Sequence, residues 1–215
     1  IRIQLADKTT NVKTGPMVQS WIVRSDVDPL GAIQSGQDRS VCGDCPLRHH
    51  TGGGCYVSPM RGPYQSWDAV NRGRYSLDPV DMVRGRPLRI GSYGDPGAAP
   101  ADVWHQLADV ASGHTGYTHQ WRDRPDLRRL VMASVESVED AEDAWDRGWR
   151  TFRVLAPGER PAKGNGRQRE VICPSDQGVT CAQCMLCDGA RDGQKTSIAI
   201  RAHGAFANRF RGSIP

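Results

Sequence analysis

The sequence is poor in several residue types, and each shortage narrows what the protein can be. Only four of the 28 basic residues are Lys, aromatic residues make up 7% of the chain, and hydrophobic residues make up 38%. No stretch approaches the roughly 18 consecutive apolar residues of a membrane span, and no charged-then-apolar leader opens the chain. We therefore expect a cytoplasmic protein with no membrane association. The 24 Gly and 14 Pro residues predict long loops around a folded core.

Cysteine is the residue type that says most about function. The first group contains Cys42, Cys45 and Cys55, and the second contains Cys173, Cys181, Cys184 and Cys187. An odd number of cysteines in two tight groups argues against a disulfide framework, and C-x-x-C pairs in a reducing compartment are typical of metal ligands. The sequence therefore predicts a metal-binding protein.

The second group favours an iron–sulfur cluster over zinc. Cys181, Cys184 and Cys187 follow one another at a uniform three-residue spacing, the arrangement that wraps three irons of a cubane in bacterial ferredoxins. A zinc ion usually takes its ligands as separated pairs. Cys173, which precedes Pro174, is the nearest candidate for a fourth ligand, and four cysteines would complete a [4Fe–4S] site.

The first group offers only three thiols, and its role has two interpretations. In one, it holds a second cluster whose remaining iron takes His49, His50, a carboxylate, water or substrate. In the other, it joins the second group in a single site. A zinc ion shared by the pairs Cys42-x-x-Cys45 and Cys181-x-x-Cys184 is a further alternative, although it leaves the other three cysteines without a role.

The hydrophobic pattern predicts an α/β fold. We expect strands at 18–23, 88–93, 115–120, 130–135, 150–155, 170–173 and 197–201, and helices at 65–71, 79–84, 101–112 and 137–147. Strands that alternate with helices or long loops predict a mainly parallel sheet, in an open or partial (βα) barrel with long cysteine-bearing loops. We expect one α/β domain over 1–215, with 1–63 as an N-terminal cysteine-loop segment and 173–190 as a second cysteine loop.

Polar and aromatic residues follow the predicted strands. In parallel α/β folds the functional residues sit at the carboxyl ends of the strands. The candidates for ligand binding are Tyr93, Asp95, Tyr117, His119 and His203, although aromatic packing between strand and helix explains the same pattern. Two basic runs, at 84–89 and 163–169, are expected to be solvated surface rather than a nucleic-acid site.

Several segments resemble uncharacterised bacteriophage proteins. These segments are NVKTG (11–15), CGDCP (42–46) and GCY (54–56), followed by residues 89–96, 116–121 and 132–135, which resemble proteins from phages of actinobacteria. The resemblance covers most of the chain, and it implies a phage-encoded (mycobacteriophage-like) protein in the host-cell cytoplasm but no particular activity.

The strand pattern also resembles the partial barrel of radical-SAM enzymes. Those enzymes bind their cluster through C-x3-C-x2-C, whereas this chain offers C-x2-C-x9-C. The resemblance therefore implies a fold, and the motif does not support binding of S-adenosylmethionine.

Two functional hypotheses arise from the sequence. The first is an iron–sulfur protein with one or two clusters, most simply [4Fe–4S], that performs redox or cluster-assisted chemistry on a small ligand or with a redox partner. The second is a zinc-stabilised, non-enzymatic module that binds nucleic acid or a host protein.

Overall fold

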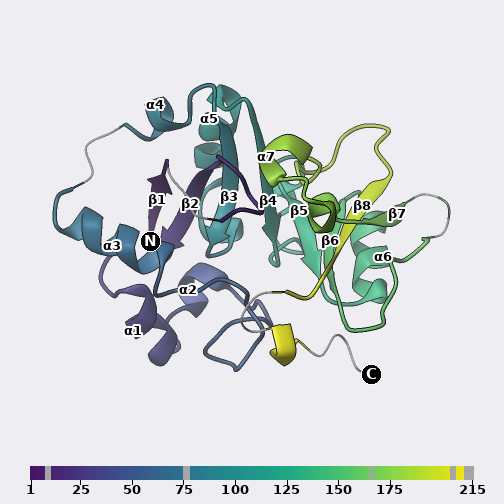
Figure 1. Cartoon of the computed structure of the whole chain (residues 1–215), viewed down its shortest axis with the longest axis horizontal. Helices are drawn as coiled ribbons and strands as arrows, with labels where there is room; N and C mark the ends of the chain where they lie inside the picture. Colours follow the sequence, from purple (N-terminus) through teal and green to yellow (C-terminus); the bar gives the residue numbers. More distant parts are fainter. Residues whose placement is uncertain (8–10, 75–77, 165, 167, 204–206, 211–215) are drawn as a thin grey trace.

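An eight-stranded sheet runs through the computed structural model in the order β1-β2-β3-β4-β5-β6-β8-β7 (Figure 1). The structure describes residues 1–7, 11–74, 78–164, 166, 168–203 and 207–210. The strands are β1 (Arg2–Ala6), β2 (Val18–Val23), β3 (Pro87–Tyr93), β4 (Gly113–Thr118), β5 (Met132–Val135), β6 (Thr151–Leu155), β7 (Arg169–Ile172) and β8 (Thr196–Arg201). The helices are α1 (Pro29–Gln34), α2 (Arg39–Cys42), α3 (Gly62–Asn71), α4 (Pro79–Val83), α5 (Ala101–Val110), α6 (Val138–Asp146) and α7 (Cys181–Cys184).

The topology is mainly parallel and open. β1 pairs with β2 in the antiparallel sense, and every other neighbouring pair is parallel. Strands β2 to β6 lie side by side in chain order, but β8 is inserted between β6 and β7. The sheet ends in two edges, β1 and β7, so it is not closed into a barrel. This arrangement confirms the predicted α/β fold with an open, mainly parallel sheet.

Most predicted elements are present, and the differences lie in the bounds of β4 and in elements that were not predicted. β4 begins at Gly113, where its pairing with Pro87 overrides the poor strand propensity of glycine. β4 ends at Thr118, so His119 lies just beyond the strand rather than within it. Four further elements were not predicted: the edge strand β1, helix α1, and helices α2 and α7, which carry Cys42 and Cys181–Cys184 where loops were expected.

The two faces of the sheet have different roles because side chains alternate along a strand. On one face, Leu88 and Ile90 of β3 join a large apolar core with residues of α5 and α6, among them Trp104 and Trp145. Figure 1 shows these two helices flanking the sheet at different strands. This face supplies the main hydrophobic stabilisation of the fold.

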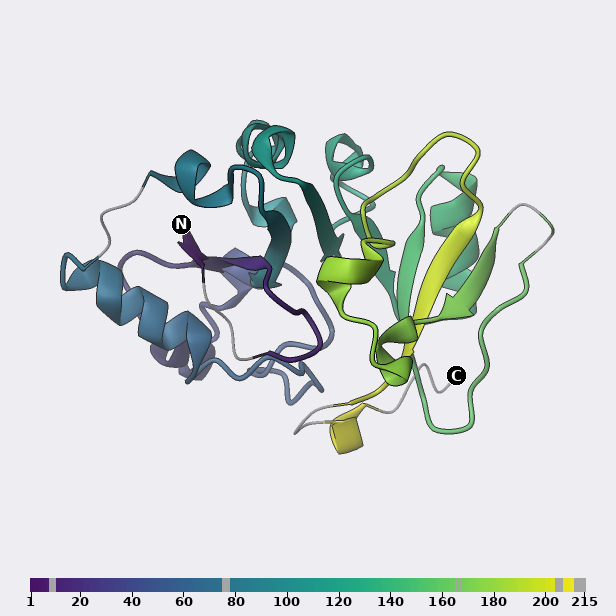
Figure 2. The ribbon, with the colours of Figure 1, turned by 45° about the horizontal axis from the view of Figure 1, so that its top comes forward.

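The opposite face carries the cysteine loops and a cavity. Residues that alternate with the core residues of β3 point to this side, including Arg89 and Tyr93. A smaller apolar cluster here contains Phe152, Ile198 and Cys187. In Figure 2, α7 and its flanking loop cross in front of the middle of the sheet.

No helix in the described part of the chain has the length and apolar character needed to cross a membrane.

Candidate functional site

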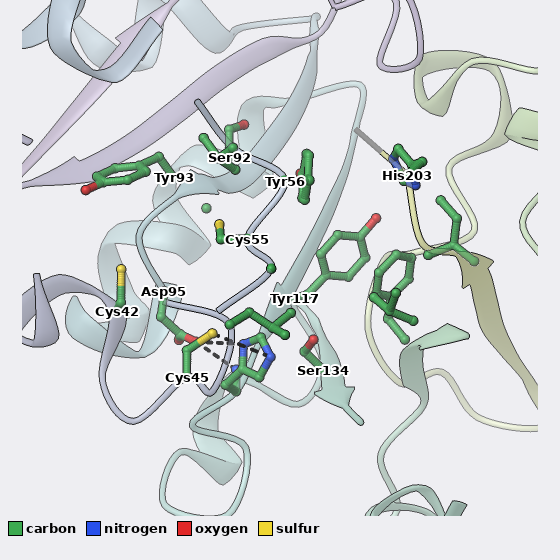
Figure 3. A pocket seen from close by; sticks show the side chains of 18 of the residues that line it. Cys42, Cys45, Cys55, Tyr56, Ser92, Tyr93, Asp95, Tyr117, Ser134 and His203 are labelled. Carbon is green, nitrogen blue, oxygen red and sulfur yellow. Dashed lines mark hydrogen bonds and ion pairs between the residues drawn. The ribbon is translucent and has the colours of Figure 1, made fainter. Parts of the chain in front are cut away.

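A cavity of about 290 Å³ lies at the carboxyl ends of the strands (Figure 3). Its wall includes all three cysteines of the first group and two of the second, Cys173 and Cys181. The five residues predicted to bind a ligand also line it: Tyr93, Asp95, Tyr117, His119 and His203. The structure therefore brings the two cysteine groups and the predicted ligand-binding residues to one place.

Local backbone contacts position the first cysteine group. Gly94 follows β3 with a φ of 76°, and a Cβ atom there would lie 2.6 Å from the carbonyl oxygen of Ile22. This close approach lets the Asp95 amide donate to the carbonyl of Val41 at 2.6 Å. Helix α2 is thereby held against the end of β3, with Cys42 as its last residue.

The loop after α2 folds back toward the helix. Arg48 forms a buried ion pair with Asp38 at 3.3 Å, and the amide of Cys55 donates to the carbonyl of Leu47 at 2.9 Å. These contacts place Cys55 on the same cavity wall as Cys42 and Cys45. The three thiols therefore share one corner of the cavity, as Figure 3 shows.

Asp95 positions His119 at the end of β4. The Asp95 carboxylate accepts hydrogen bonds from the hydroxyl of Thr118 at 2.6 Å, from the amide of His119 at 2.7 Å and from the amide of Gly97 at 2.8 Å. Burial raises the pKa of Asp95, and these bonds offset only part of that rise. The carboxyl group is a local anchor for the strand end.

His119 is the histidine that the structure brings to the first cysteine group. Its Nε2 atom lies 3.7 Å from Cys45 Sγ and 2.8 Å from Glu136 Oε1. Burial alone lowers the pKa of His119, but electrostatic interactions and hydrogen bonds with Cys45 and Glu136 outweigh burial and raise the pKa well above its ordinary value. By contrast, His49 and His50 bond the carbonyl oxygens of Val57 and Ile33.

The second group is assembled by α7 and the turn that follows it. All four of its cysteines line a small void of about 20 Å³. The amide of Cys181 donates to the carbonyl of Lys13 at 2.9 Å, so the segment before β2 supports the start of α7. Thr180 and Gln183 form a capping box there. The carbonyl of Cys187 accepts from the amide of Gly116 on β4 at 3.0 Å.

Arg150 clamps the chain that follows Cys187. Its buried guanidinium bonds the Asp188 carboxylate at 2.8 Å and the carbonyls of Leu186 and Gly189 at 2.6 and 2.7 Å. These hydrogen bonds join the second cysteine loop to the start of β6. They were not predicted, because the residues around Arg150 in the sequence do not indicate that its partners lie in a distant loop.

Burial disfavours free thiolates in both groups. It raises the pKa of Cys55 to about 11 and that of Cys187 to about 12. It also raises the pKa values of Cys42, well above the ordinary value, and of Cys184. These thiols are therefore protonated at neutral pH in the absence of a cation, and a metal that binds them must displace protons.

Each cysteine group also faces a buried hydroxyl that has no hydrogen-bond partner among the described residues. Tyr93 Oη is one; burial raises the pKa of Tyr93, and charges on Cys42 and Cys55 would raise it further. Thr115 Oγ1 is the other, and Thr115 lines the small void of the second group. Buried hydroxyls normally find a partner, so both positions suit a group that accepts hydrogen bonds.

Arg89 is the main side chain of the cavity that sequence reasoning missed. The basic run at 84–89 was interpreted as solvated surface, which is wrong for Arg89, since only 5% of that residue is exposed. Its guanidinium lies 3.0 Å from Tyr117 Oη and 3.1 Å from Tyr56 Oη. The alternation of Arg89 with the core residues Leu88 and Ile90 is the signal that places it on the opposite face. The second run, 163–169, lies partly outside the described residues.

Among the described residues, no three His, Cys, Asp or Glu side chains are close enough together to hold a metal ion as they stand. Comparisons of the chain with protein-family models, with curated proteins and with solved structures gave no match. The function must therefore be inferred from the residues of the site.

Proposed function

We propose that the chain is an iron–sulfur protein whose two cysteine groups flank one ligand cavity. The convergence of the two groups, which lie far apart in the sequence, carries this proposal. Seven free cysteines, five of them on the wall of one cavity, are far more than a structural core needs. The spacing of Cys181, Cys184 and Cys187 suits a cubane, with Cys173 as the fourth ligand on the same void.

The site also offers hydrogen-bond donors to the sulfur atoms of such a cluster. Hydrogen bonds to the sulfur atoms tune iron–sulfur clusters, and the hydroxyls of Tyr93 and Thr115 are two buried donors beside the cysteines that lack an acceptor among the described residues. When bound, a cluster supplies one-electron transfer or a coordination site for a small ligand. The cavity supplies the room for that ligand.

His119 has a defined place in this proposal. The first group offers three thiols, and the Nε2 atom of His119 lies 3.7 Å from Cys45 Sγ. Asp95 orients the backbone of His119, and Glu136 bonds its Nε2 atom. We assign His119 as a proton donor, or as the fourth ligand of the first group once Glu136 releases it. His49 and His50 are less suited, because their rings bond carbonyl oxygens.

The setting that we propose comes from the resemblance to phage proteins. A phage-encoded chain would act in the host-cell cytoplasm, where thiols stay reduced and remain available to iron.

The test is metal analysis of the full chain purified without oxygen. We expect iron and acid-labile sulfide in equal amounts and a broad absorption in the visible range that bleaches on reduction. Cys184→Ser removes one proposed ligand and should lower iron and sulfide content, whereas Val179→Ala alters the same void without removing a ligand. Unchanged iron in Cys184→Ser would refute the assignment of the second group.

A structural zinc ion is the second candidate, and the size of the void favours it. The space among the four cysteines of the second group is about 20 Å³, slightly more than one water molecule needs. A space of this size suits a single ion better than a cubane, which is several times larger. Colourless protein with stoichiometric zinc would establish this candidate. Binding to nucleic acid that weakens steeply with added salt would then support a non-enzymatic role.

A further inference from the structure

The Lys and Arg side chains of the cavity wall differ in whether a carboxylate balances their charge. Three Lys and Arg residues line the cavity among the described residues: Lys13, Arg48 and Arg89. Lys13 pairs with Asp176 at 3.9 Å, and Arg48 pairs with Asp38 at 3.3 Å. Arg89 forms no ion pair with a carboxylate of the described residues, and its guanidinium instead contacts phenol and thiol groups.

The partners of Arg89 are unusual for a buried cation. Its guanidinium donates to the hydroxyls of Tyr117 and Tyr56 and approaches Cys181 Sγ at 3.9 Å. It also lies over the Tyr117 ring, 4.6 Å from the ring centroid. Neutral phenols orient a guanidinium but do not balance its charge. A buried charge without a counter-charge destabilises a fold, so Arg89 marks a place that suits an anion.

The rest of the wall indicates what kind of anion fits. Away from Arg89 the cavity is bounded mainly by apolar and aromatic side chains, among them Phe152, Val154 and Ile200. Because Tyr56 Oη accepts a hydrogen bond from Arg89, its own proton can be donated to a ligand. The cavity therefore combines a cation that lacks a carboxylate partner, and a hydroxyl donor beside it, with a mainly apolar wall, the usual composition of a small-molecule site.

We propose that the cavity binds a small organic anion. Its carboxylate or phosphate group pairs with Arg89 and the hydroxyl of Tyr56, and its apolar body lies against Phe152 and the neighbouring strand residues. The inference rests on the proposed function, because it names the class of the small ligand assigned there to the cavity. Arg89 also touches Cys181, so the bound anion lies next to the second cysteine group.

A competing role for Arg89 is to balance only the charge of thiolates in the second group. The two roles separate experimentally, since one predicts an effect on anion binding and the other an effect on metal content alone.

The experiment is calorimetric titration of the full chain, purified without oxygen, with benzoate and with inorganic phosphate at constant ionic strength. Wild-type protein should bind at least one of them saturably, with a Kd of about 1 mM or tighter. Arg89→Gln should weaken this binding on the order of tenfold or more, as expected for the loss of a charge-assisted hydrogen bond. Lys13→Gln is the matched control, since it removes one positive charge from the same wall; its Kd should stay within about twofold.

A second variant keeps the test decisive if Arg89→Gln fails to fold, which circular dichroism and thermal melting report. Tyr56→Phe removes one hydroxyl from a partly exposed residue and should weaken binding by about threefold to tenfold. If benzoate and phosphate both fail to saturate at about 10 mM, the inference is wrong. Equal affinity in Arg89→Gln and Lys13→Gln overturns it as well, and a change in iron content without a change in anion affinity establishes the competing role.

Iron and sulfide analysis on the same samples separates this inference from the proposed function. Protein without iron whose benzoate affinity depends on Arg89 supports the anion site and refutes the cluster. Iron-containing protein whose anion affinity is the same in wild type and in Arg89→Gln refutes the anion site and leaves the cluster in place.

Discussion

Replacing Arg150 with methionine tests how firmly the second cysteine loop is fixed to the sheet. Only 1% of Arg150 is exposed. Its guanidinium donates four hydrogen bonds of 2.6 to 2.8 Å, to the carbonyls of Leu186, Gly189 and Thr196 and to the carboxylate of Asp188. Methionine replaces most of the volume of the arginine stem, so the expected loss comes from the bonds rather than from a cavity.

The magnitude depends on the partners that the substitution leaves behind. Removing one member of a buried ion pair costs about 3–5 kcal/mol, and each buried carbonyl left without a donor adds up to about 1–3 kcal/mol where the loop cannot relax. Arg191 also pairs with Asp188 and limits the cost at that carboxylate. We therefore expect Arg150→Met to lower the free energy of unfolding by about 3–5 kcal/mol, and Tm by roughly 6–20 °C for a chain of this size.

Urea denaturation followed by circular dichroism measures this loss, and an unchanged m-value shows that the same surface unfolds. Hydrogen exchange supplies a local measurement, since the Gly116 amide bonds the Cys187 carbonyl and should exchange faster when the loop loosens. Arg129→Met is the control, because its ion pair with Asp192 is exposed and contributes about 1 kcal/mol at most. If Arg150→Met cost no more than this control, the loop would be held by the cysteines and whatever they bind, and the reasoning would be refuted.

Two further substitutions test how the site is positioned. Gly94→Ala adds a Cβ atom 2.6 Å from the Ile22 carbonyl oxygen at a φ of 76°, and it should lower the free energy of unfolding by about 3 kcal/mol or more. Gly73→Ala, where a Cβ atom meets nothing within 4 Å, should cost about 1 kcal/mol; equal costs in urea denaturation would contradict the proposed close approach. Ser137 caps α6 by accepting from the Asp140 amide at 2.9 Å, so Ser137→Ala should cost about 1 kcal/mol while Ser137→Asp should stay close to wild type. A loss of equal size in both variants would show that the cap is not what stabilises α6.

The elements that the sequence predicted well are those whose local pattern agrees with their tertiary setting. The strand at 18–23 has the predicted bounds, and the helix capped by Ser137 begins where its cap indicates. β1 was not predicted; its antiparallel pairing with β2 places it at the edge of the sheet. The start of β4 was displaced because Gly113 and His114 are held by pairing with β3. Such pairing depends on a distant strand, which no local pattern reports.

The residues of the candidate site also differ in how well the sequence predicts them. The cysteines are recognisable from spacing alone, and the polar residues after each strand are expected from the rule for parallel sheets. Arg89 and Arg150 are different, because their importance comes from partners far along the chain. Tyr56 reaches Arg89 from a loop before α3, and Leu186 reaches Arg150 from the second cysteine loop. A basic residue looks the same in sequence whether it lies on the surface or beneath a loop.

The convergence of the two cysteine groups is itself a consequence of strand order. The first group lies in the connection that leaves β2, and the second lies in the connection that leaves β7. Both strands run parallel to the central ones, so both connections begin on the side of the sheet where these strands have their carboxyl ends. Proximity of the two loops is set by topology, but their contact is not. It depends on the segment before β2, whose Lys13 carbonyl bonds Cys181, and on Arg89, which spans from Tyr56 beside the first group to Cys181 in the second. A ligand bound to Arg89 would therefore affect the contacts of both loops. This is the physical reason to expect that metal binding and anion binding influence one another.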